Sequence, residues 1–111
     1  MKEISTEELL ELYNDTMKKC GTYLLNEEND TIAYNIFEEF DIGVHSYLHI
    51  DSLTRLFDAG LISRYKFDRS LSLRQSVLDL QNSGEWKMDT FRTSEKWKEI
   101  MHLSDSLNET N

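Results

Sequence analysis

The stretch DTIAYNIFEEFDIGVHSYL, residues 30–48, carries its apolar side chains at steps of mostly three and four residues. Such spacing places them on one side of an α-helix, because the helix turns once in about 3.6 residues. The predicted stripe consists of Ile32, Ile36, Phe37 and Phe40, and continues to Val44, Tyr47 and Leu48 if the helix persists through Gly43. Asp30 or Thr31 can cap its start, and the alternative to a continuous helix is a kink at residues 41–43.

On the N-terminal side, Ser5-Thr6-Glu7-Glu8 contains a capping box. Ser5 can accept a hydrogen bond from the Glu8 amide, and the Glu8 carboxylate reaches back. One face then holds Leu9, Tyr13, Met17, Cys20 and Leu24. We expect a first helix over about residues 5–25, which Gly21 either ends as a left-handed cap or only weakens.

On the C-terminal side, three further helices and a connector are predicted. A short helix, Leu53 to Ala59, is capped by Asp51 or Ser52 and stopped by Gly60. A central helix runs from a Ser63 cap to Gly84, and residues 85–93 form a short helical connector. The last helix follows a Ser94 cap, and its inward residues are Trp97, Ile100, Met101, Ser104 and Leu107.

These segments predict an all-α fold, a compact bundle of about five helices with short connections. The chain of 111 residues contains no proline, so no predicted helix is interrupted by one. Short links favour antiparallel neighbours. The length fits a single domain, residues 1–111, and we expect residues 108–111 to fray.

The charge is uneven along the chain. There are 21 acidic and 12 basic side chains, a net charge of −9, and residues 1–41 alone hold 11 acids and 3 bases. Phosphates and anionic lipids would be repelled, so direct binding to nucleic acid or to a membrane surface is not expected. The charge favours a basic protein partner, and the alternative is an acidic surface that only maintains solubility.

The segment from residue 27 to residue 41 is the candidate binding site. Its carboxylates are Glu27, Glu28, Asp30, Glu38, Glu39 and Asp41. Together they could match a basic cleft as a crude phosphate mimic, with Tyr34 and Tyr47 as aromatic anchors of the kind that interfaces favour. The alternative is a solvated helix face without a partner.

Catalytic signatures are absent from the sequence, and we expect a non-enzyme without metal or cofactor. Asp41, His45 and His49 are spaced by four and would share a helical face that could hold zinc, but Ser46 stands where the metalloprotease pattern needs Glu. Surface or capping histidines are the favoured interpretation. Cys20 is expected to be a buried structural thiol rather than a nucleophile.

The first eight residues are polar and acidic, without the apolar run of a secretory signal. No stretch of the chain approaches the roughly 18 apolar residues of a membrane span. We therefore expect a cytoplasmic protein. Its oligomeric state is left open by the sequence.

Four pieces of the chain resemble a known family. These are Ser52–Ile62 (SLTRLFDAGLI), Ser72-Leu73-Arg74, Thr93–Ile100 (TSEKWKEI) and Ser104-Asp105. Over about residues 43–107 the pattern is similar to small helical immunity proteins that accompany bacterial polymorphic toxins, including contact-dependent growth inhibition systems. The resemblance implies a non-enzyme that binds one cognate toxin domain tightly in the cytoplasm. Many such toxins are nucleases with basic clefts.

The leading hypothesis is therefore an immunity protein that occludes the basic active site of a toxin, with an RNase as the expected class of toxin. A second hypothesis is a small acidic regulatory or scaffolding module that binds a partner helix or self-associates. A third is a metalloenzyme that uses His45 and His49.

Overall fold

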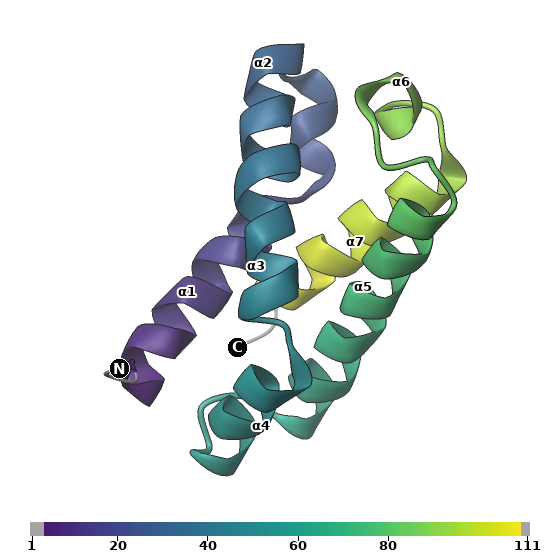
Figure 1. The fold of residues 1–111 in the computed structure, drawn as a ribbon. Helices are drawn as coiled ribbons and strands as arrows, with labels where there is room; N and C mark the ends of the chain where they lie inside the picture. The colour runs from purple at the N-terminus through teal and green to yellow at the C-terminus, as the bar shows by residue number, and fades with distance from the viewer. Residues whose placement is uncertain (1–3, 110–111) are drawn as a thin grey trace.

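The computed structural model describes residues 4–109 and confirms the all-α bundle of about five main helices (Figure 1). Its elements are α1 (Thr6–Lys18), η1 (Thr22–Asn26), α2 (Asn29–Ile32), η2 (Ala33–Phe40), α3 (Asp41–Ser46), α4 (Ile50–Asp58), α5 (Arg64–Asn82), α6 (Met88–Phe91) and α7 (Glu95–Glu109). Helix α7 packs against both α5 and α1. No helix of the described residues is long and apolar enough to cross a membrane.

The first helix is shorter than predicted. It begins with the predicted cap, in which the Ser5 side chain accepts from the Glu8 amide at 3.1 Å. It ends at Lys18, and Gly21 is extended at φ 172° rather than left-handed. A tertiary contact holds the chain beyond it, because the Thr22 hydroxyl donates to the Asp105 carboxylate of α7 at 2.6 Å. The predicted inward residues of this region are nevertheless all buried.

Residues 29–46 form one continuous helix, here called the long helix, with η2 as a π-helical middle. The alternative of a kink at residues 41–43 is wrong, since all three lie in α3. The N-cap position is Glu28, without a side-chain cap, so Asp30 or Thr31 as caps is wrong too. The fully buried side chains are Ile32, Ile36, Phe40 and Val44, with Leu48 just beyond.

The four-residue spacing of these buried side chains gives a physical reason for the π-helical middle. Steps of four residues in an α-helix drift by about 40° each, because a turn takes about 3.6 residues. A π-helical turn holds more residues, since its hydrogen bonds span five positions instead of four. Mixing the two keeps a stripe of strict period four facing the core.

The turns around α4 and α5 are closed by their glycines. Gly60 and Gly84 have φ of 74° and 83°, and both were predicted as helix stops. In each case the next amide bonds back across the turn, Leu61 N to Leu56 O at 3.0 Å and Glu85 N to Leu80 O at 3.3 Å. The predicted Ser63 cap is present, accepting from the Lys66 amide at 3.1 Å.

The start of α4 differs from prediction. Its cap is His49, whose Nδ1 accepts from the Asp51 amide at 3.2 Å, and neither Asp51 nor Ser52 caps the helix. The helix accordingly starts at Ile50, three residues before the predicted Leu53. An imidazole acceptor is not among the preferred cap types, which explains why the pattern pointed elsewhere.

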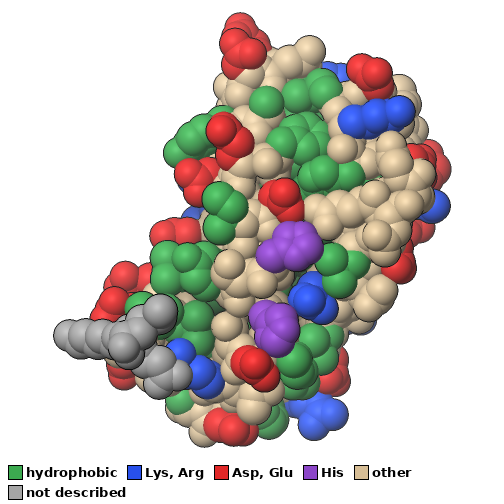
Figure 2. Space-filling view, in the orientation of Figure 1, with side chains coloured by type: hydrophobic (Ala, Val, Ile, Leu, Met, Phe, Trp, Pro, Cys, Tyr) green, Lys and Arg blue, Asp and Glu red, His purple; other side chains and the backbone are tan. Residues whose placement is uncertain are grey.

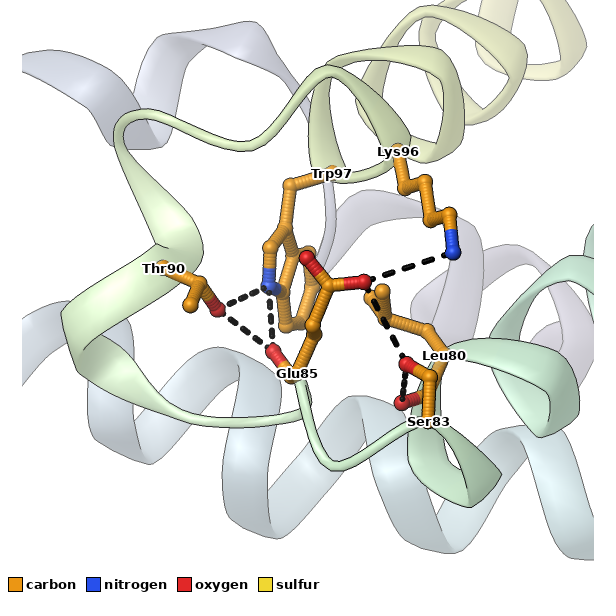
Figure 3. Close-up of polar contacts among 6 residues, drawn as sticks. All are labelled: Leu80, Ser83, Glu85, Thr90, Lys96 and Trp97. Carbon is orange, nitrogen blue, oxygen red and sulfur yellow. Dashed lines mark hydrogen bonds and ion pairs between the residues drawn. The ribbon is translucent and has the colours of Figure 1, made fainter.

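An aromatic cluster closes the end of the bundle near α6. Trp97 is fully buried, and the centre of its ring lies 4.7 Å from that of Trp86 and 4.9 Å from that of Phe91. Its indole N–H donates to the Glu85 carbonyl at 3.0 Å and to the Thr90 hydroxyl at 3.1 Å (Figure 3). The side chain thereby ties the predicted connector to the last helix.

The last helix follows its predicted inward face. All five residues expected to point inward are buried: Trp97, Ile100, Met101, Ser104 and Leu107. Asn108 and Glu109, which we expected to fray, belong to α7, and the Asn108 amide donates to the Met17 carbonyl at 2.8 Å. The rest of that predicted tail, residues 110–111, lies outside the described residues.

Candidate interaction surface

The predicted acidic segment runs along the long helix instead of forming one compact patch. Glu27 and Glu28 precede the helix and Asp30 lies in its first turn, all three exposed. Glu38 and Glu39 lie in η2, and Asp41 begins α3. Eight residue steps along the helix separate Asp30 from Glu38, about 12 Å at a rise of about 1.5 Å per residue. On the face seen in Figure 2, carboxylates follow the edge formed by α1 and the long helix, with apolar side chains between them.

The second group of carboxylates, Glu38, Glu39 and Asp41, lies on both sides of the buried stripe. Glu39 faces α1, whereas Asp41 accepts a hydrogen bond from Gln81 of α5 at 2.8 Å. These two residues flank Phe40 on opposite sides, since successive helical residues point about 100° apart. The structure therefore brings Glu39 together with Tyr34 and Tyr47, and it separates Asp41 from them.

Most of the predicted carboxylates are not neutralised within the molecule. Among the ion pairs of residues 4–109, only Asp41 of the six takes part, with His45 Nε2 at 3.4 Å. One cation lies near the first group, because Arg92 donates to the Leu25 and Glu27 carbonyls at 2.6 and 2.7 Å. These bonds hold the loop before the long helix and leave its carboxylates exposed.

A groove lies between α1 and the long helix. Its volume is about 350 Å³, and its lining residues are Leu12, Asp15, Thr16, Lys19, Glu39, Ile42 and Tyr47. We call it the α1–α3 groove. Ile42 is 59% exposed, the highest value among the large hydrophobic side chains described. Two of the predicted site residues, Glu39 and Tyr47, thus line a surface that also has an apolar part.

Tyr34 stands at the edge of this surface. It is 51% exposed, and a hydrogen bond with Glu39 raises the pKa of its hydroxyl. The Lys19 Nζ atom lies 5.7 Å over the centre of the Tyr34 ring, a cation–π contact. The predicted role of Tyr34 as an exposed aromatic residue beside carboxylates is consistent with this placement, while its role in binding stays a prediction.

The sequence interpretation missed Leu12, Asp15 and Ile42. A signal for Ile42 was present, because it lies two residues from both Phe40 and Val44 and so falls about 200° from the buried stripe. An apolar residue on the outward face of an amphipathic helix is the kind of feature that marks contact surfaces. Leu12 and Asp15 carried no such signal.

The histidines do not meet as a metal site. His45 lies in α3 and contacts Asp41 and Gln81, whereas α3 ends at Ser46 and His49 caps α4. Within the described part of the chain, no group of three or more His, Cys, Asp or Glu side chains could hold a metal ion. The shared helical face expected for Asp41, His45 and His49 is therefore wrong.

Cys20 is fully buried in the core. Burial raises the pKa of its thiol to about 12. The thiol therefore stays protonated in the folded protein far above neutral pH. This environment suits a structural residue, since a nucleophile would need a thiolate.

The Cys20 thiol should make the fold less stable in alkali. In the unfolded chain the thiol loses its proton near its ordinary pKa of 9.0, whereas the folded protein keeps it to about 12. The free energy of unfolding should therefore fall by up to about 1.4 kcal/mol per pH unit above pH 9 from this group. Urea denaturation of wild type and Cys20→Ala at pH 8, 9 and 10 measures the effect, and equal slopes in both proteins would contradict it.

Comparison of the chain with family models, curated proteins and solved structures finds no match. What the fold and the surface define is a small all-α protein with an acidic, partly apolar groove.

Proposed function

We propose that this protein is an immunity protein, which binds a cytotoxic nuclease domain and neutralises it by covering a basic active site. The observation that carries the proposal is the set of six carboxylates on and just before the long helix, five of which form no ion pair with a described residue. Carboxylates without an internal ion pair along one segment are available to cations of a partner. The resemblance of residues 43–107 to immunity proteins supports the same function.

Binding would combine steric occlusion with charge complementarity. A field of one sign steers an oppositely charged partner, so association would be fast and sensitive to salt. Slow dissociation would come from the desolvated contacts at the centre of the interface. The protein would perform no bond-making step itself.

Growth protection tests the proposal directly. The neighbouring reading frame is inspected for a large secreted protein, and its C-terminal domain is expressed in a susceptible bacterium with and without this chain. We expect growth only when the chain is present, together with a one-to-one complex on gel filtration. If the domain is toxic and the chain neither restores growth nor binds it, the proposal is wrong.

Charge reversal should slow association. We expect the variant with Glu27, Glu28, Glu38 and Glu39 changed to Lys to associate with the toxin domain at least about tenfold more slowly at low ionic strength. Circular dichroism should show an unchanged helical fold, because these side chains are at least partly exposed. Stopped-flow association at several salt concentrations measures the effect.

The matched control reverses four exposed carboxylates elsewhere, Asp58, Asp89, Glu99 and Glu109. It changes the net charge equally, so it should slow association less than the first variant does. Equal slowing by both would mean that only total charge matters and that the long helix is not the binding surface.

The groove also supports a second candidate, a regulatory or scaffolding module that binds a partner protein. The specific observation is the exposed Ile42, which a partner would cover. Growth protection distinguishes the two candidates, because a scaffolding module would bind its partner without rescuing cells from a toxin.

A further inference from the structure

We infer that the α1–α3 groove receives an arginine or lysine side chain of the partner protein. The stem of that side chain would lie against Ile42, and its cation would reach Asp15 and Glu39. This inference rests on the proposed function, which supplies the basic partner, and it adds the place and the chemistry of the central contact.

The groove has the two parts that such a side chain needs. Leu12, Ile42 and Tyr47 give it apolar surface, and its carboxylates come from opposite walls, Asp15 from α1 and Glu39 from η2. Lysine and arginine pair an apolar stem with a charged head and bury the stem along apolar surface. Arginine also offers several donors in a fixed fork, which suits two separate carboxylates.

Both carboxylates are available to a cation from outside. Neither Asp15 nor Glu39 forms an ion pair with a Lys or Arg of the described chain. The cation that lines the groove, Lys19, is placed over the Tyr34 ring instead. A partner side chain would therefore find its acceptors unoccupied by the protein's own charges.

The charge of the surroundings selects this occupant over others. A nucleic acid would bring phosphates to Asp15 and Glu39, and a second copy of the chain would bring another surface from a protein of net charge −9. A purely apolar partner would leave the two carboxylates desolvated without a counter-charge, which is costly. A basic side chain satisfies both parts of the groove.

A peptide titration tests the inference without the toxin. A blocked hexa-arginine peptide is added to ¹⁵N-labelled protein at low ionic strength, and amide shifts are followed by NMR. We expect the largest shifts at α1 and α3 residues around the groove. The groove variant Asp15→Asn/Glu39→Gln should raise the dissociation constant about tenfold.

Two further charge variants serve as controls. Asp58→Asn/Glu99→Gln removes the same charge from exposed sites that do not line the groove and should change the constant less than about twofold. Glu28→Gln/Asp30→Asn removes it from the other end of the acidic segment and should have an intermediate effect.

The apolar part is tested by Ile42→Ser, with Ile50→Ser as the matched control on α4. Both isoleucines are exposed, 59% and 42%, so both variants should fold. We expect only Ile42→Ser to weaken peptide binding, by about threefold to fivefold. Analytical ultracentrifugation of the same proteins should give a monomer.

The outcomes separate this inference from the proposed function. Shifts spread over the whole acidic surface, or equal losses in all three charge variants, overturn the groove as the site. So does an unchanged constant in Ile42→Ser, or a dimer that this variant dissociates. Growth protection by the groove variant at wild-type level would also overturn the inference while leaving the immunity function intact, whereas failure of wild-type protection overturns the function itself.

Discussion

Replacing Trp97 by alanine should lower the free energy of unfolding by about 3–5 kcal/mol, the range for a buried large-to-small substitution. The side chain is fully buried and contacts the rings of Phe37, Trp86 and Phe91. Its removal leaves a cavity at the junction of the long helix, the connector and α7. Rigid aromatic neighbours cannot collapse fully into such a space, so most of the cost should remain.

Trp97→Phe separates packing from hydrogen bonding. Phenylalanine keeps an aromatic ring but loses the indole N–H that bonds the Glu85 carbonyl and the Thr90 hydroxyl (Figure 3). We expect a smaller loss, about 1–3 kcal/mol.

Urea denaturation followed by circular dichroism measures both proteins. A half-buried neighbour gives the control, because Trp86→Ala should cost less than Trp97→Ala. A loss below about 1 kcal/mol for Trp97→Ala would mean that the cluster does not hold this end of the bundle.

Features of the fold that depend on neighbouring residues could be predicted from the sequence, and features that depend on distant residues could not. The all-helical fold, the inward faces and the Gly60 and Gly84 stops were predictable, because apolar period and glycine caps act over neighbouring residues. The π-helical turns of η2 were not predicted. The end of α1 was not, since it depends on Asp105, which is 83 residues away from Thr22 in the sequence. The cap of α4 was assigned to Asp51 or Ser52 instead of His49, because imidazole acceptors are uncommon at that position.

The candidate surface was predictable only in part. The acidic segment was visible as composition, and the burial of the Ile32 to Val44 stripe determines which of its residues point outward. The side of the groove that α1 forms could not be predicted from the sequence, because α1 and α3 meet through tertiary packing. The prediction left out Asp15, which lines the groove. It included Asp41, which lies on the opposite flank of the helix, against Gln81.

Gly43→Ala should lower the free energy of unfolding by about 2 kcal/mol, although helix propensity alone predicts a gain of about 1 kcal/mol. Gly43 is buried in α3 where that helix crosses α1, and an added Cβ would overlap the Thr16 side chain. The new methyl must push the two helices apart. A net loss of stability from a glycine-to-alanine change in a helix interior is therefore evidence of close approach.

Adding Thr16→Ala to the Gly43→Ala variant tests whether the loss of stability comes from contact with the Thr16 side chain. Removing the Thr16 hydroxyl and methyl relieves the two nearest contacts, while its Cβ would still lie 2.8 Å from the new methyl, so rescue should be partial. A double-mutant cycle by urea denaturation should give a coupling of about 1 kcal/mol or more. Additive effects would contradict direct contact. Because Thr16 also lines the α1–α3 groove, Gly43→Ala should weaken hexa-arginine binding even where the protein remains folded.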